Sequence, residues 1–137
     1  MIIDAKELIV GRIATVAAKQ ALLGEDVVIV NSEKAVVTGT KLNLHASFLR
    51  KRSMGTHAKG PFFPRSEDRI LKRMIRGMLP YKQSKGKVAF KRIMCYKGIP
   101  SEFQGKETIT IKEAHVSKVP NLKYMTLEKI SKVLGEK

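Results

Sequence analysis

The stretch GRIATVAAKQALLGEDVVIV, residues 11–30, decides the fold of this chain. Alanines and aliphatic residues cover most of the circumference of a helix over residues 12–23, so this helix should be largely buried. Gly24 suits the position after the last helical turn, where a positive φ is common. Residues 27–30 are four consecutive β-branched residues, which is typical of a strand in a parallel sheet with helices on both faces. Together with a short strand at residues 2–5, they predict a βαβ unit.

Beyond this unit, residue type and periodicity predict an alternation of strands, helices and loops. We expect a short strand at 36–37, a helix from an N-cap at Thr38 to about Leu49, an irregular loop at 50–64, a helix at 66–79, a second loop at 81–87, a strand at 88–96, a short peripheral strand at 108–111 and a last helix capped by Thr126. The inward side of the helix after Thr38 is expected to hold Leu42, His45, Ala46 and Leu49. The free N–H groups at Thr38 and Gly39 either bind a backbone phosphate or are simply capped.

The helix predicted over residues 66–79 has two chemically different faces. At about 100° per residue, the apolar side chains fall in one arc and the basic side chains in the opposite arc. The apolar arc contains Ile70, Leu71, Met74, Ile75 and Met78, and the basic arc contains Arg69, Lys72, Arg73 and Arg76. Ser66 is a suitable N-cap, and Glu67 and Asp68 suit the positive end of the helix dipole. These two acids are therefore assigned to helix stability rather than to catalysis.

The length of 137 residues and a hydrophobic content of 43% predict a single domain over residues 1–137. No apolar run approaches the roughly 18 residues of a membrane span, and Asp4 and Glu7 interrupt the start of the chain where a signal peptide would be apolar. We therefore expect a cytosolic protein. Cys95 is the only cysteine, and its apolar neighbours predict a buried side chain rather than a reactive thiol.

Positive charge is concentrated in the middle of the chain. Residues 50–92 hold fourteen of the 27 Lys and Arg residues but only two of the 12 acidic residues, whereas the first 49 residues are balanced between the two signs. Clustered cations are typical of a protein that binds nucleic acid, because phosphates attract the cations and release counterions. A merely solvated basic face is the alternative, although a dense block of one sign repels itself unless a polyanion binds.

The sequence contains no usable catalytic or cofactor motif. His45, His57 and His115 do not have the spacing of metal ligands, and the glycines at positions 11 and 39 match neither a dinucleotide fingerprint nor a phosphate-binding loop. We therefore expect no metal, no cofactor and no small-molecule substrate. Phe62 and Phe63 lie in the basic loop, where they either stack on a base or pin the loop to the core.

Several short motifs, in order along nearly the whole chain, resemble the L-thirteen family of large-subunit ribosomal proteins. They are Ile3-Asp4-Ala5, Val10-Gly11-Arg12 with Ala14, Val30-Asn31-Ser32-Glu33-Lys34, Val37-Thr38-Gly39, Arg76-Gly77-Met78-Leu79-Pro80 and Tyr96-Lys97-Gly98-Ile99-Pro100. The last two are the specific ones. The basic run through Gly60-Pro61 and Pro64-Arg65-Ser66 resembles the archaeal and eukaryotic branch, and the absence of the long eukaryotic extension after Lys137 favours an archaeal source.

This resemblance implies a three-layer α/β/α domain on a four-stranded, mainly parallel sheet, with basic loops. It also implies a non-enzymatic, structural role in the large ribosomal subunit, in which the protein binds large-subunit rRNA, contacts neighbouring ribosomal proteins and supports assembly. In that setting we expect phosphate contacts from Arg50, Lys51, Arg52, Lys59, Arg65, Arg69, Lys72, Arg73, Arg76, Lys82, Lys85 and Lys87, with His57 as a stacking or hydrogen-bonding residue. An RNA-binding translational regulator that acts off the ribosome is the alternative, and a nucleotide-dependent enzyme is a weaker one.

Overall fold

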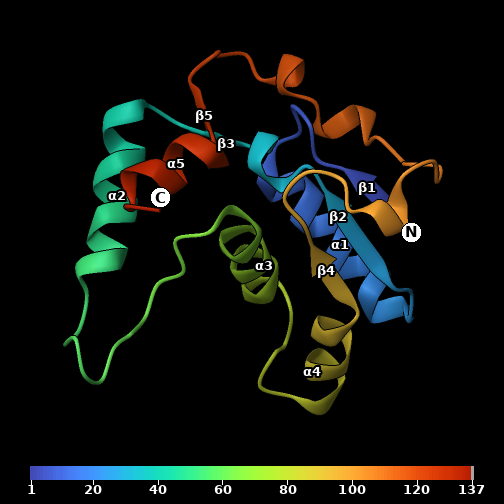
Figure 1. Ribbon diagram of the computed structural model, residues 1–137, viewed down its shortest axis with the longest axis horizontal. Helices are drawn as coiled ribbons and strands as arrows, with labels where there is room; N and C mark the ends of the chain where they lie inside the picture. Colours follow the sequence, from blue (N-terminus) through green and yellow to red (C-terminus); the bar gives the residue numbers. More distant parts are fainter. Residues whose placement is uncertain (137) are drawn as a thin grey trace.

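The computed structural model describes residues 1–136. Its strands are β1 (Ile2–Asp4), β2 (Val27–Val30), β3 (Val36–Thr38), β4 (Ile93–Cys95) and β5 (Tyr124–Thr126). Its α-helices are α1 (Val10–Leu23), α2 (Lys41–Ser53), α3 (Glu67–Gly77), α4 (Ser84–Lys91) and α5 (Leu127–Val133). Four short 3-10 helices complete it: η1 (Ser32–Lys34), η2 (Ser101–Phe103), η3 (Lys112–Ala114) and η4 (Val116–Lys118). Figure 1 shows their arrangement.

The predicted βαβ unit is confirmed. β2 lies between β1 and β4 and pairs with both in parallel, so that Ile29 is in register with Ile3 on one side and with Cys95 on the other. α1 connects β1 to β2, and it ends at Gly24, whose φ of 107° is the left-handed conformation expected after a last helical turn.

The sheet is smaller than predicted. It has three strands rather than four, and β3 and β5 form a separate antiparallel pair. The peripheral strand expected at 108–111 is reduced to a single parallel bridge, in which the Ile109 N–H donates to the Ile2 carbonyl (2.8 Å) and the Asp4 N–H donates to the Ile109 carbonyl (3.2 Å). The neighbours of Ile109 are exposed, so no packing extends this bridge into a strand.

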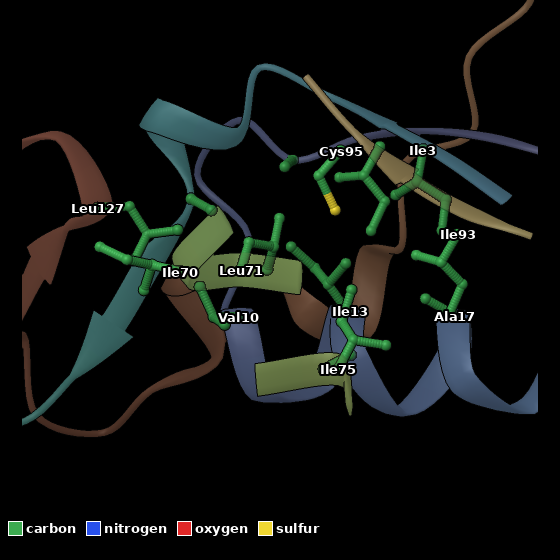
Figure 2. Close-up of a cluster of buried hydrophobic side chains, with 14 of the residues drawn as sticks. Ile3, Val10, Ile13, Ala17, Ile70, Leu71, Ile75, Ile93, Cys95 and Leu127 are labelled. Atoms are coloured by element: carbon green, nitrogen blue, oxygen red, sulfur yellow. The ribbon is translucent and has the colours of Figure 1, made fainter. Parts of the chain in front are cut away.

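The core lies between the three-stranded sheet and the helices on one of its faces. α1, α3 and α4 contact the sheet, and Figure 2 shows Ile13, Ala17 and Leu71 below the side chains of Ile3, Ile93 and Cys95. On the opposite face, Ile2 and Val28 are only half-buried and Met94 is 41% exposed. The helices thus cover one face of this sheet, in place of the predicted three layers.

Two segments differ from their prediction because tertiary contacts outweigh local propensity. α4 occupies much of the expected loop at 81–87 and of the expected strand at 88–96, which leaves only Ile93–Cys95 as β4. α4 buries Ala89 and Gly86 and contacts α1. These two small residues allow the helix to pack closely against its neighbours, and this packing favours a helix over the expected loop and strand.

α2 also differs from its prediction, in both bounds and orientation. It begins at Lys41 after Thr40, whereas Thr38 lies in β3, so the predicted helix start at Thr38 is wrong. Neither alternative for its N–H groups, phosphate binding or helix capping, therefore applies, and the Gly39 N–H donates to the Lys123 carbonyl. The helix continues to Ser53, into the expected loop. Its buried residue is Phe48, while Leu42 is 81% exposed. The neighbours of α2 are α5 and β5 and the ring of Phe63, which contacts Phe48.

α3 and α5 agree with the predicted helices. α3 begins after Ser66 and buries Ile70, Leu71 and Ile75, although Met78, beyond its last residue, is 46% exposed and Leu79 is buried instead. α5 begins after Thr126 and buries Leu127 and Ile130.

None of the helices in residues 1–136 is long and apolar enough to span a membrane.

Candidate nucleic-acid interface

The residues predicted to bind RNA lie on four consecutive parts of the chain. Arg50, Lys51 and Arg52 form the last turn of α2; His57, Lys59 and Arg65 lie in the loop before α3; Arg69, Lys72, Arg73 and Arg76 lie on α3; Lys82 precedes α4, and Lys85 and Lys87 lie in it. In Figure 1 the loop and α4 extend from the two ends of α3. The basic surface, as we call this set of residues, thus surrounds one helix.

No cation of the basic surface forms an ion pair within residues 1–136. The ion pairs of this region are Lys97 with Glu67, Lys97 with Glu136, His115 with Glu7 and Lys132 with Glu128. The acids that do form ion pairs in this region have other partners, and the charge of the basic surface is left for a ligand or for solvent.

Glu67 shows how the fold separates its acids from this surface. Its side chain is buried, at 7% exposure, and its carboxylate lies 2.5 Å from the Nζ of Lys97. Lys97 donates hydrogen bonds to Glu67 and to Glu136, and both raise its pKa far above the usual value, the bond to Glu67 having the larger effect. Glu67 therefore has a structural role, as predicted, but it acts by ion pairing in addition to its place at the helix start. Lys97 is correspondingly not a free cation.

Arg73 connects α3 to the basic loop. Its Nη1 donates a hydrogen bond to the Phe62 carbonyl (3.1 Å), and its guanidinium lies 4.9 Å from the centre of the Phe63 ring. Phe63 in turn packs edge-on against Phe48 of α2, with ring centres 6.1 Å apart. Phe63 therefore pins the loop to the core, whereas Phe62 is 70% exposed. Of the two roles considered for this aromatic pair, pinning the loop is observed for Phe63, and stacking on a base stays a prediction for Phe62.

Aromatic rings also support two other cations of α3. The Nζ of Lys72 lies 5.2 Å from the centre of the Phe90 ring, and the guanidinium of Arg76 lies 5.0 Å from the centre of the Tyr81 ring. Such contacts hold a cation in place without neutralising its charge. Because Tyr81 immediately precedes Lys82, the contact of Arg76 also joins α3 to the turn before α4.

The end of α2 and the loop meet α3 at one open hollow and meet each other at a second. One, of about 390 Å³, is lined by Lys51 of α2 and Arg73 of α3 together with apolar side chains of the loop. The other, of about 430 Å³, is lined by Arg52, His57, Phe62 and Arg65 among others. The structure thus brings together the cations of α2, the loop and α3.

α4 contributes less uniformly than predicted. Lys85 and Lys87 are both exposed. Residues separated by two positions point about 200° apart around a helix, so these two lysines cannot share a face. Lys91, four residues after Lys87, lies on the same side as Lys87 and is exposed. It was missed because a strand was expected at 88–96; the helical spacing of Lys87 and Lys91 is the signal that reveals it.

Other chemistry is not supported by this part of the chain. Residues 1–136 contain no group of three or more His, Cys, Asp or Glu side chains that could hold a metal ion. Burial raises the pKa of the Cys95 thiol to about 12, so the thiol stays protonated at neutral pH and is a poor nucleophile. This agrees with the expectation of an inert, buried cysteine.

Known proteins are similar to this chain over most of its length. A family model described as "Ribosomal protein L13" matches residues 1–102. The protein named "Large ribosomal subunit protein uL13" of Methanococcoides burtonii is 46% identical over 99% of this chain and 98% of its own length. Proteins of the same name are 44% identical in Methanosarcina barkeri, over 99% of this chain and 98% of the relative, and 44% identical in Archaeoglobus fulgidus, over 98% and 86%.

Proposed function

Since this chain belongs to the ribosomal protein L13 family, we propose that it is a structural constituent of the large ribosomal subunit that binds large-subunit rRNA and supports its assembly. The relatives are archaeal, which supports the archaeal branch over the others. The protein is not an enzyme, its place is the cytoplasmic ribosome, and its partners are rRNA and neighbouring ribosomal proteins.

The observation that carries this proposal is the absence of ion pairs on the basic surface within residues 1–136. A protein with a net charge of +15 repels itself unless a polyanion binds. RNA phosphates supply that charge, and the release of their counterions favours association. The surface also spans several elements, so it can contact RNA segments that converge on it and lower the repulsion between them.

We assign distinct parts to the cations of this surface. Those held on aromatic rings, Lys72, Arg73 and Arg76, present charge at fixed positions and suit phosphates in a defined RNA geometry. Lys51 at the end of α2 is held in the same way, with its Nζ 5.1 Å from the centre of the Phe48 ring. The other cations at the end of α2, in the loop and near α4 are exposed and adapt to the local path of the RNA. Phosphate contacts of both kinds position the protein but carry no sequence information.

Sedimentation of a cell lysate in a high-salt sucrose gradient tests the proposal. Adsorbed basic proteins are released by salt because their binding is electrostatic, whereas a constituent of the subunit stays with it. We expect the chain in the large-subunit fractions. Recovery of the whole pool in the soluble fractions would refute the structural role and would leave a translational regulator that acts off the ribosome as the better account.

A further inference from the structure

The loop between α2 and α3 holds an aromatic ring outward on a fixed backbone. Gly60 exchanges two backbone hydrogen bonds with Thr56, at 2.8 and 3.3 Å. A Cβ at Gly55 would lie only 1.9 Å from the Gly60 carbonyl oxygen, so the two sides of the loop touch. The hydrogen bond from Arg73 to the Phe62 carbonyl ties this compact loop to α3. Phe62 therefore stays exposed although its backbone is well anchored.

The hollow beside Phe62 has the size and chemistry of a small-ligand site. Its volume of about 430 Å³ falls within the range of about 300 to 1,000 Å³ that is usual for such sites. Its lining includes two arginines and a histidine but no acidic residue. An anion is therefore favoured over a cation or a neutral apolar ligand.

The two arginines that line this hollow lie close to one another, beside the residue Gly135 that follows α5. A Cβ at Gly135 would lie 3.7 Å from Nη1 of Arg52 and 4.0 Å from Nη1 of Arg65, so the two guanidinium groups approach the same point from α2 and from the loop. Like charges placed so close favour a shared anion, and guanidinium groups match the geometry of phosphate oxygens. An aromatic platform beside a phosphate site is the combination that a nucleotide requires.

We propose that this hollow binds a single unpaired nucleotide of the RNA, with its base stacked on Phe62 and its phosphate held by Arg52 and Arg65. The inference rests on the proposed RNA-binding function and extends it to a specific subsite. A base in a duplex is already stacked on both sides and its faces are closed to protein, whereas a base in a loop, bulge or end is free to stack on an aromatic side chain. The subsite is thus selective for unpaired RNA.

A tryptophan placed at Phe62 tests this directly, because the chain has no tryptophan of its own. We would titrate Phe62→Trp with a single-stranded oligoadenylate of about 12 nucleotides and with a duplex of the same length. Stacking should quench the indole fluorescence with the single strand and leave it largely unchanged with the duplex. Leu42→Trp, also exposed but at the far end of α2, is the matched control and should not be quenched by either.

Phe62→Ala supplies the energetic test, and its exposed position should leave folding intact, as circular dichroism would verify. Loss of one stacked base should weaken oligoadenylate binding by about 5- to 140-fold, with an unchanged dependence on salt, since no charge is removed. Filter binding of wild-type protein to large-subunit rRNA serves as the separate test of the proposed function.

The outcomes distinguish the two proposals. Quenching by the single strand alone, together with the loss in Phe62→Ala, supports the subsite. If the wild type binds rRNA but the Phe62→Trp indole is not quenched, or is quenched equally by the duplex, the subsite is refuted and the proposed function stands. If the wild type does not bind rRNA, the proposed function itself fails.

Discussion

Replacing Gly86 by alanine should destabilise the protein, although alanine is the better helix former. Gly86 lies in α4, directly against the turn that follows α3. A Cβ on Gly86 would lie 2.1 Å from the Pro80 carbonyl oxygen, 2.4 Å from the Pro80 carbonyl carbon and 2.9 Å from the Tyr81 nitrogen. All three are backbone atoms, so no change of rotamer relieves the clash, and α4 or the turn must move.

The expected magnitude follows from two opposing effects. Non-bonded heavy atoms prefer separations of about 3.5 to 4.0 Å, so the shift must exceed about 1 Å. Forcing an extra methyl group into a packed site costs about 1 to 3 kcal/mol, whereas the change from glycine to alanine in a helix gains about 1 kcal/mol. Because backbone atoms must move, we expect the cost near the upper limit and a net loss of about 1 to 2 kcal/mol in the free energy of unfolding.

Equilibrium unfolding in urea measures this difference, and Gly77→Ala is the matched control. Gly77 also lies in a helix, but a Cβ there would meet no atom within 4 Å beyond its chain neighbours and the backbone of its own helix. This variant should be unchanged or more stable by up to about 1 kcal/mol. If Gly86→Ala were as stable as Gly77→Ala, the close contact between α4 and the turn after α3 would not exist, and the reasoning that places α4 would be wrong.

Three further predictions concern the interface and the contacts that support it. Arg73→Ala should weaken rRNA binding and reduce the slope of log affinity against log salt by about 0.7 to 0.9 if Arg73 contacts one phosphate; an unchanged slope would remove Arg73 from the interface. Phe48→Ala should lower the free energy of unfolding by about 3 to 5 kcal/mol through a core cavity, and it should free Phe63, so that protease cleavage in the loop becomes faster; a melting temperature equal to that of the wild type would contradict this role. Glu136 is partly desolvated, which raises its pKa, but hydrogen bonds from Lys97 and from the Ser131 hydroxyl outweigh this and lower it. A carboxyl group whose pKa is lowered by folding stabilises the folded state at pH values above its unfolded-state pKa, and this stabilisation is lost as the pH falls through its folded-state pKa. Glu136→Gln should therefore lower the free energy of unfolding by about 0.5 to 1 kcal/mol at about pH 7 and leave it unchanged at about pH 2. An equal loss at both pH values in urea unfolding would contradict the ion pair.

The elements that could be predicted from the sequence are those whose local pattern and tertiary environment agree. α1 carries apolar residues around most of its circumference and is buried accordingly, and Val27–Val30 is β-branched throughout and forms the central strand. α3 separates apolar and basic residues so clearly that its bounds and buried face follow almost directly, except at Met78. In these segments, burial reinforces what the sequence already favours.

The elements that could not be predicted depend on distant contacts. β3 pairs with β5 from the other end of the chain, and neither strand carries a local signal of its partner. Val88 and Phe90 favour a strand, but Gly86 and Ala89 allow α4 to approach the turn and α1, and this packing decides the outcome. The inward side of α2 was missed because its single buried aromatic, Phe48, does not create a periodic apolar stripe.

The location of the basic surface was predictable because it depends on charge, and the positions of the Lys and Arg residues can be read directly from the sequence. Its internal organisation was not. Lys72, Arg73 and Arg76 rest on aromatic rings from three different segments, and only the folded structure brings those rings to α3. Likewise, the sequence does not reveal that Lys97 forms ion pairs with Glu67 and Glu136, because only the folded structure brings these residues together.

The most direct test of the central claim is ultraviolet cross-linking of intact large subunits, followed by mass spectrometry of the peptides that carry nucleotides. If the basic surface binds rRNA, nucleotides should be attached to peptides from residues 50–92, above all to those with the exposed rings of Phe62 and Tyr81, because aromatic rings in contact with bases cross-link readily. Cross-links confined to β1, α1 or α5, with none between residues 50 and 92, would show that another face of the protein binds the RNA.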